Sequence, residues 1–294
     1  MAGTLYVVAT PIGNLADITH RAVDVLRGVA WIACEDTRQT RKLLERYGIE
    51  ARLVSYHEHN EEQRSGELLR RLEAGDDVAL VSDAGTPLVS DPGYRLVRRA
   101  VESGIRVVPI PGPAALLAAL SASGLETDSF YFGGFLPRKR SERARLLETL
   151  APLPCTLIFY EAPHRILETL ADLEAAMPSR PVVIARELTK LHEEFLRGTA
   201  CELREQLERR GSIKGEITLL VGRSREGASP AAAAGRGHEG DTSGCLSCPL
   251  DARQIRAELA RLQQQEGLPR MEAIKRLARK LGLGKREIYR LTEG

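Results

Sequence analysis

The 294-residue sequence predicts an α/β protein with two α/β domains, the first built on a parallel sheet and the second on a mixed sheet, followed by a small C-terminal helical module. Two patterns carry this prediction. Short apolar runs alternate with helical periodicity through about residue 222, which is typical of α/β folds. A stretch rich in Ala, Gly, Ser and charge then precedes three short helical patterns. Hydrophobic residues make up 43% of the chain, enough for sizeable cores.

The first domain is expected over residues 1–115. Nearly unbroken apolar strands between helices indicate a parallel sheet that is covered on both faces. Asn60 is expected to cap the third helix, and Asp91-Pro92 to supply a cap and a first-turn proline for the fourth. The predicted strands are residues 4–9, 29–33, 78–81 and 105–110, and the helices are residues 17–27, 40–47, 60–75 and 91–104.

The second domain is expected over residues 116–223. It completes the cleft that the first domain opens, and its sheet is expected to be mixed. A helical pattern at residues 116–120 leads into it. The predicted strands lie near residues 130–132, 156–160, 182–186 and 217–221, and the helices near residues 143–150, 165–177 and 201–210.

Residues 224–250 are expected to form a flexible linker, because small and charged residues dominate them. Three helical patterns follow near residues 252–265, 271–281 and 285–291. The last two, joined by a glycine turn at 281–284, resemble a helix-turn-helix, and a plain helical hairpin fits them equally well.

Residues 251–294 carry 11 Lys/Arg against 6 Asp/Glu, whereas the rest carries 31 against 34. A basic module on a slightly acidic body suggests an anionic partner such as nucleic acid. A second basic run, Arg138-Lys139-Arg140 with Arg143 and Arg145, is the alternative anchor for such a partner.

The composition favours a cytoplasmic protein. No run of about 18 uncharged apolar residues is present, and the first twelve residues lack the basic start of a signal peptide. Five cysteines, an odd number, argue against a disulfide framework. Cys245 and Cys248 form a C-x-x-C downstream of His238, but no second ligand pair exists, so we expect no metal site.

Four turns rich in glycine and proline fall at predicted strand ends, at residues 11–14, 83–87, 111–114 and 133–135. In a parallel sheet, the carboxyl ends of the strands line the crevice where small ligands bind, and glycine lets the backbone approach a ligand closely. The sequence contains neither G-x-G-x-x-G after the first strand nor a P-loop. The turns therefore predict a small-molecule pocket that does not hold a dinucleotide.

Polar clusters accompany these turns, at residues 35–38, 55–60, 160–165 and 186–190. Each cluster alone fits a helix cap or a surface ion pair, but their repeated placement at strand ends favours function. His57 and His59 are interpreted as substrate-contacting or structural, because no third metal ligand is defined.

Four motifs make the sequence similar to a known family: residues 8–15 (VATPIGNL), 35–38 (EDTR), 82–87 (SDAGTP) running on to 90–93 (SDPG), and 160–165 (YEAPHR). They resemble the tetrapyrrole methylase superfamily over about residues 4–222. Their order and spacing resemble the branch that 2′-O-methylates a cytidine of 16S ribosomal RNA, rather than the corrin and siroheme methylases.

This resemblance implies a homodimer whose two α/β domains enclose S-adenosyl-L-methionine, with 16S RNA of the small ribosomal subunit as partner and substrate. It also implies the residues of the cofactor site. In the first domain these are Pro11, Gly13, Asp83, Ala84, Gly85, Thr86, Pro113 and Ala114, and in the second they are Tyr160, Glu161, Ala185 and Thr218.

Methylation of a ribose hydroxyl calls for alignment of a weak nucleophile and for a group that accepts its proton. Asp36 is the first candidate, because it ends the second predicted strand, and Glu35 and Lys190 follow. A small-molecule methylase of the same fold is the alternative enzyme, and a ligand-sensing nucleic-acid-binding regulator is the alternative from another class. The basic C-terminal module argues against the first, and the full motif set against the second.

Overall fold

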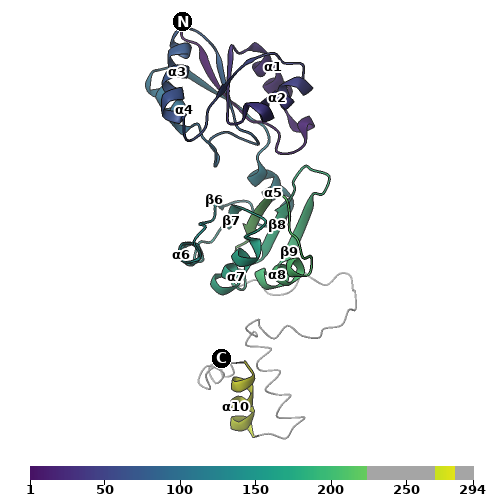
Figure 1. Cartoon of the computed structure of the whole chain (residues 1–294). Helices are drawn as coiled ribbons and strands as arrows, with labels where there is room; N and C mark the ends of the chain where they lie inside the picture. Colours follow the sequence, from purple (N-terminus) through teal and green to yellow (C-terminus); the bar gives the residue numbers. More distant parts are fainter. Residues whose placement is uncertain (224–268, 282–294) are drawn as a thin grey trace. The chain divides into compact units, whose positions relative to one another are not determined.

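The computed structural model describes residues 1–223 and 269–281 (Figure 1). The chain divides into two compact units, Met1–Ala228 and Ser229–Gly294. The first unit contains two five-stranded sheets, one parallel and one mixed, each packed against helices. The predicted fold class of two α/β domains is therefore confirmed.

The first sheet has the strand order β3-β2-β4-β1-β5, and all of its strand pairs are parallel. Strand β1 lies between β4 and β5, so that Leu5 pairs with Val78 on one side and Val107 on the other. The strands are β1 (Thr4–Val8), β2 (Trp31–Cys34), β3 (Arg52–Ser55), β4 (Val78–Val81) and β5 (Arg106–Ile110).

Two pairs of helices cover the two faces of this sheet (Figure 1). Helices α1 (His20–Gly28) and α2 (Thr37–Arg46) pack on the face that carries Ile32 and Val81. Helices α3 (Glu61–Glu73) and α4 (Tyr94–Glu102) pack on the opposite face, against Ala33 and Leu80. Neighbouring residues of one strand thus serve different cores, which explains why the strands read as nearly continuous apolar runs.

The second sheet has the order β6-β7-β10-β8-β9. Strands β6 and β7 are parallel, whereas the other three pairs are antiparallel. The strands are β6 (Phe130–Phe135), β7 (Thr156–Glu161), β8 (Val182–Arg186), β9 (Glu194–Gly198) and β10 (Ile217–Val221).

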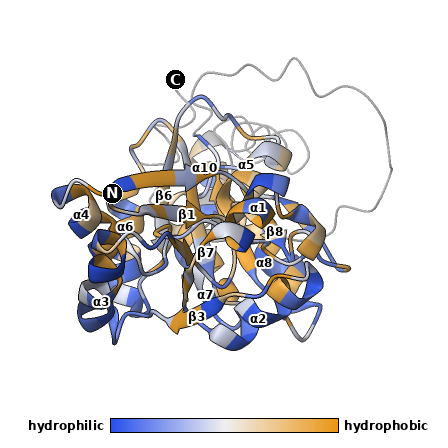
Figure 2. Cartoon of the chain, turned by 90° about the horizontal axis from the view of Figure 1, so that it is seen from above, coloured by the Kyte–Doolittle hydropathy of each residue, from blue (hydrophilic) through white to orange (hydrophobic). Residues whose placement is uncertain are grey.

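Helix α5 (Ala115–Ser123) covers one face of the second sheet, packing near Ile158 and Leu220. Helices α6 (Arg140–Leu150), α7 (Ile166–Ala176) and α8 (Ala200–Glu208) cover the other, around Phe159 and Leu219. In Figure 2 the hydrophobic colour gathers on strands between the helices, and α2 and α3 are mostly hydrophilic. The predicted boundary between residues 115 and 116 falls in the first turn of α5.

Two strands were not predicted, β3 and β9. Of the four residues of β3, only Val54 is buried, and β9 has a single buried residue, Leu196. Both strands lie at a sheet edge, where one neighbour is missing and the apolar pattern is weak.

Asn60 is the N-cap residue of α3, as predicted, whereas the cap predicted at Asp91-Pro92 is wrong. The Asn60 side chain makes no cap hydrogen bond; its carbonyl accepts the His57 N–H and its amide donates to the Ser55 carbonyl. Helix α4 begins at Tyr94, with Gly93 at the N-cap position at a φ of 137°. Because that φ lies outside the helical region, the helix cannot extend back to Asp91-Pro92, and Asp91 is left in the preceding loop.

In the second unit the structure describes a helix, α10 (Arg270–Leu281), where residues 271–281 were predicted to be helical. The predicted helices at 252–265 and 285–291, the turn at 282–284, the linker at 224–250, and Cys245 and Cys248 lie outside the described residues. No helix in the described part of the chain is long and apolar enough to span a membrane.

Candidate active site

Three turns at the carboxyl ends of neighbouring strands β4, β1 and β5 are bonded to one another. Thr10 and Gly85 exchange two backbone hydrogen bonds, of 2.8 and 3.0 Å. The Thr86 hydroxyl donates to the Pro113 carbonyl at 3.1 Å. The turns therefore form one fixed floor at the edge of the sheet where ligands of parallel sheets bind.

Gly85 is required at the centre of this floor. Its φ is 88°, a conformation that side-chain-bearing residues rarely adopt. A Cβ there would lie 3.3 Å from Cγ2 of Ile12 and 3.8 Å from the Pro113 carbonyl oxygen. Because Gly85 has no side chain, its backbone is accessible from the space above the floor.

The second sheet supplies a row of side chains at one level. Thr218 on β10 pairs with Tyr160 on β7 and with Ala185 on β8. An irregularity in β6 between Phe132 and Phe135 shifts the register, so that Phe135 pairs with Tyr160. The rings of Phe135 and Tyr160 meet edge to face, with centroids 5.6 Å apart. Bulges re-aim side chains in this way.

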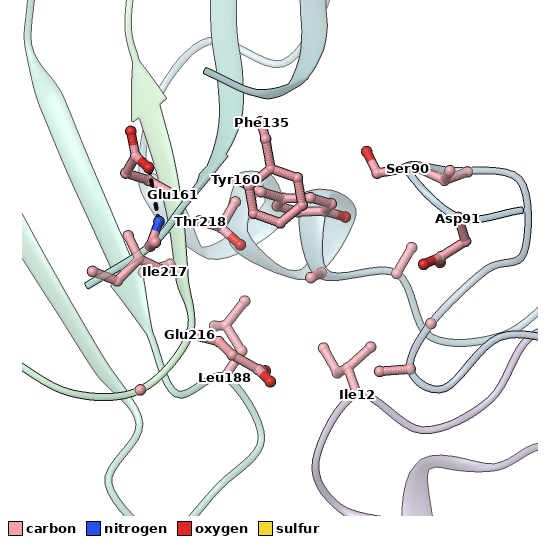
Figure 3. Close-up of a pocket in the computed structure, with 18 of the residues that line it drawn as sticks. Ile12, Ser90, Asp91, Phe135, Tyr160, Glu161, Leu188, Glu216, Ile217 and Thr218 are labelled. Carbon is pink, nitrogen blue, oxygen red and sulfur yellow. Dashed lines mark hydrogen bonds between the residues drawn. The ribbon is translucent and has the colours of Figure 1, made fainter. Parts of the chain in front are cut away.

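A cleft of about 360 Å³ lies between the floor and this row (Figure 3). Its volume is in the range of small-molecule sites. Nine of the residues predicted for the cofactor site line it, namely Asp83, Ala84, Gly85, Thr86, Ala114, Tyr160, Glu161, Ala185 and Thr218. The others that line it are Ile12, Val89, Ser90, Asp91, Ala115, Phe135, Ala162, Pro163, Leu188, Gly215, Glu216 and Ile217.

Pro11, Gly13 and Pro113 were also predicted for the cofactor site, and they are not among the residues that line the cleft. Gly13 instead packs against the loop after β8, where a Cβ would lie 2.7 Å from Cγ of Lys190. The next residue, Asn14, donates its N–H to the Thr189 hydroxyl at 3.0 Å. The turn at 11–14 thus joins loops of the two sheets. Whether each predicted residue contacts the cofactor stays a prediction.

Asp36, the first candidate base, holds Arg38. Its carboxylate accepts the backbone N–H of Arg38 and pairs with the Arg38 guanidinium at 2.7 Å. These hydrogen bonds lower the pKa of Asp36 to about 2. A carboxylate with so low a pKa is a weak base, and Asp36 is not among the residues that line the cleft.

Lys190 and Glu35 also lie outside the cleft lining. The Lys190 ammonium bonds to Glu187 at 2.9 Å and to Glu216 at 3.1 Å. Burial alone would lower the pKa of Lys190, but these hydrogen bonds raise it overall, so the group stays protonated and has no lone pair for a proton. Burial, followed by the charge of Asp83, raises the pKa of Glu35.

Sequence reasoning missed Asp91. Burial raises the pKa of Asp91 to about 6; the charges of Glu35 and Asp83 act in the same direction, and a hydrogen bond with Ser82 opposes them. Asp91 belongs to the SDPG motif at residues 90–93, which the sequence singled out but which also fits a helix cap. This motif was the feature of the sequence from which Asp91 could have been chosen as a site residue.

Two further predictions concern histidines and arginines. His57 and His59 lie edge to face, 5.9 Å apart, and among the described residues no group of three or more His, Cys, Asp or Glu side chains is placed to hold a metal ion. Arg143, a member of the alternative RNA anchor, is fully buried and bonds to Asp172 at 2.7 Å. Arg143 therefore cannot contact RNA, which corrects that part of the prediction.

Residues 4–204 match the family model described as tetrapyrrole (corrin/porphyrin) methylases, the class that the two sheets and their shared cleft define. Solved structures of this class are similar in fold. A cobalt precorrin-4 methyltransferase matches with a TM-score of 0.57 and 20% identity, covering 74% of this chain and 94% of its own. A uroporphyrin-III C-methyltransferase from Thermus thermophilus, solved with S-adenosylhomocysteine, has a TM-score of 0.53 and 20% identity, covering 75% and 97%.

Curated relatives are much more similar in sequence, and they carry the name ribosomal RNA small subunit methyltransferase I. One from Micromonospora olivasterospora is 55% identical over 225 residues, which are 76% of this chain and 72% of that protein. One from Synechocystis is 46% identical over 291 residues, 99% of this chain and 97% of that protein. The chain belongs to the tetrapyrrole methylase family and, within it, to the family of ribosomal RNA small subunit methyltransferase I.

Proposed function

We propose that this chain transfers a methyl group from S-adenosyl-L-methionine to the 2′-hydroxyl of a cytidine ribose in the 16S RNA of the small ribosomal subunit. The observation that carries the proposal is the cleft between the glycine turn after β4 and the row of side chains on the second sheet, in a chain about half of whose residues are identical to those of relatives with that name. The enzyme is then an rRNA (cytidine-2′-O-)-methyltransferase.

The cleft suits S-adenosylmethionine. Its volume of about 360 Å³ is appropriate for a molecule of that size, and the left-handed Gly85 leaves backbone groups accessible beside the Asp83 carboxylate. The Thermus neighbour was solved with S-adenosylhomocysteine, the demethylated form of the same molecule. When bound, S-adenosylmethionine supplies a methyl group on a positively charged sulfur, which is a good leaving group.

Residues on the two sides of the cleft have different tasks in this proposal. Asp83 to Thr86, on the floor, hold the ribose and amino-acid portions of the cofactor. Tyr160, Ala185 and Thr218 border its adenosine from the second sheet. The buried Glu161 carboxylate accepts the Ala162 N–H at 2.8 Å and the Thr169 hydroxyl at 2.6 Å, so it fixes the loop at this border (Figure 3).

RNA is favoured over a tetrapyrrole as the acceptor, because a small-molecule methylase has no need of a basic C-terminal module. We propose residues 224–250 as a linker and 251–294 as that RNA-binding module. Lys275 and Arg276 are exposed on α10, on the opposite side of the helix from the buried Ala273 and Ile274. The tetrapyrrole methylases at about 20% identity support the fold alone.

Three further points belong to the proposal: the enzyme acts as a homodimer, it works in the cytoplasm, and its substrate is RNA within the small ribosomal subunit. The motif set of residues 4–222 supports them through the resemblance described above.

Equilibrium binding and methyl transfer test the proposal together. Calorimetry should show saturable binding of S-adenosylmethionine by the full chain. Labelled methyl groups should then appear in the RNA of purified small ribosomal subunits, and not in a uroporphyrinogen-type acceptor. Transfer to the tetrapyrrole alone would favour the alternative enzyme, and binding without any transfer would favour a ligand-sensing regulator.

A further inference from the structure

Asp91 lies at the wall of the cleft that faces the second sheet. In Figure 3 its carboxylate points into the cavity from the loop after β4, on the side opposite Tyr160 and Phe135. Burial raises the pKa of the Tyr160 hydroxyl, and the negative charge of Asp91 raises it further. Both residues line the cleft. A molecule that fills the cleft would lie between them.

The backbone on either side of Asp91 is held in an unusual conformation. Leu88 and Ser90 have φ values of 72° and 68°, and Gly93 has a φ of 137°. Two such residues with side chains are costly, and conformations of this kind concentrate at functional sites. Gly93 is also closed in, because a Cβ there would lie 2.8 Å from Cδ2 of Leu80. The loop thus holds Asp91 at one place in the cleft instead of at the cap of α4.

The groups around Asp91 make it a proton acceptor at neutral pH. Burial disfavours its ionised form most, and the charges of Glu35 after β2 and Asp83 after β4 add to this effect, whereas Ser82 stabilises the ionised form by a hydrogen bond. A general base works best when its pKa lies near the working pH. Asp36, at a pKa of about 2, and the protonated Lys190 do not meet this condition.

We propose that the Asp91 carboxylate is the group that accepts the proton of the attacking ribose hydroxyl, an inference that rests on the function proposed above. The ribose oxygen forms a bond to the methyl carbon while the bond between that carbon and sulfur breaks. The electron pair of the broken bond stays on sulfur, and the hydroxyl proton moves to Asp91, which later releases it to water. The products are the 2′-O-methyl ribose and S-adenosylhomocysteine.

Single-turnover methyl transfer to small ribosomal subunits, at saturating S-adenosylmethionine, tests this role. Asp91→Asn keeps the size and hydrogen-bonding capacity of the side chain but cannot take the proton, so the rate constant should fall by roughly 10²-fold or more. Calorimetry should give a cofactor Kd within threefold of wild type. The wild-type rate should rise with pH around a midpoint near 6 and then level off, because only the ionised carboxylate accepts a proton.

Asp91→Glu should recover part of the rate and keep a rising pH profile. Asp24→Asn, an exposed aspartate on α1 away from the cleft, is the matched control and should behave as wild type. An Asp91→Asn rate within threefold of wild type overturns the proposal. A loss confined to cofactor affinity, or a tenfold loss in Asp36→Asn beside a normal Asp91→Asn, does so too. Wild-type chain that methylates no small subunit overturns this proposal together with the proposed function.

Discussion

Both backbone polar groups of Gly85 are hydrogen-bonded to Thr10: its N–H donates to the Thr10 carbonyl, and its carbonyl accepts the Thr10 N–H. This backbone pairing fixes the glycine at a φ of 88°, directly below the space proposed for the cofactor. A residue with a Cβ at this position would be strained in the left-handed backbone conformation, and its Cβ would occupy space beside Ile12.

Gly85→Val should therefore weaken S-adenosylmethionine binding at least tenfold, since a β-branched residue is strained at this φ by about 1–3 kcal/mol and its methyl groups enter the cleft. Calorimetry on the folded variant measures the effect. Gly28→Ala is the control, because a Cβ at Gly28 meets nothing within 4 Å. Unchanged affinity in a folded Gly85→Val variant would mean that this turn does not touch the cofactor.

Single residues also show how far the sequence can predict a site. The turns at strand ends were recognisable because glycine and proline act locally, and nine predicted residues do line the cleft. The surroundings of the carboxylates were not recognisable in the same way. Asp91 owes its raised pKa first to burial and then to the charges of Glu35, from the end of β2, and Asp83, whereas the hydrogen bond with Ser82 opposes them. Such long-range proximity has no local signature.

Among the elements, strand β6 places an exposed aromatic ring at the cleft. Gly133 cannot carry a side chain, because a Cβ would lie 2.6 Å from the ring of Phe159, and Gly134 has a φ of 62°. The resulting bulge sends Phe135 toward the cleft, where it stays 60% exposed. Enzymes that modify RNA commonly stack an unpaired base on an aromatic ring.

Phe135→Ala should raise the KM for small ribosomal subunits by roughly 5- to 100-fold, which corresponds to the ~1–3 kcal/mol of one base–aromatic stack. Steady-state methylation at saturating cofactor measures it. Phe130→Ala is the control, since Phe130 is exposed on the same strand but does not line the cleft. Equal KM values for the two variants would contradict a stacking role.

Helices α6 and α7 are joined by the buried pair Arg143–Asp172. Asp172→Ala should lower the free energy of unfolding by about 3–5 kcal/mol, because it leaves a buried guanidinium without its main partner. Arg140→Ala, whose side chain is 81% exposed, should cost less than about 1 kcal/mol. Urea unfolding compares the two variants, and similar midpoints for both would show that the buried pair does not hold these helices together.

The elements of both sheets were predictable where a strand is buried on both sides, as in β4 and β10. The edge strands β3 and β9 were not predicted, since each has only one buried residue and gives no continuous apolar run. Helix beginnings were the other weak point, because a cap pattern such as Asp91-Pro92 is also a loop pattern, and only the backbone of Gly93 decides between them.

At the scale of the whole molecule, we propose that residues 1–223 bind the cofactor in the cleft and that residues 251–294 bind the RNA. Deleting the chain after Arg223 should leave S-adenosylmethionine affinity unchanged, because both sheets belong to one compact unit. Affinity for small ribosomal subunits should fall, and its dependence on salt should become shallower, since fewer phosphate contacts release fewer counterions. Filter binding at several salt concentrations measures both. An unchanged salt slope would indicate that the exposed basic residues near 138–145 bind the RNA instead.

Ribose-methylation mapping of 16S ribosomal RNA, from cells with and without this chain, tests the central claim most directly. Loss of the chain should remove the 2′-O-methyl group from a cytidine of that RNA. Wild-type chain should restore the modification, and the Asp91→Asn variant should not. A 16S RNA whose ribose methylation is the same with and without the chain would contradict the proposed function.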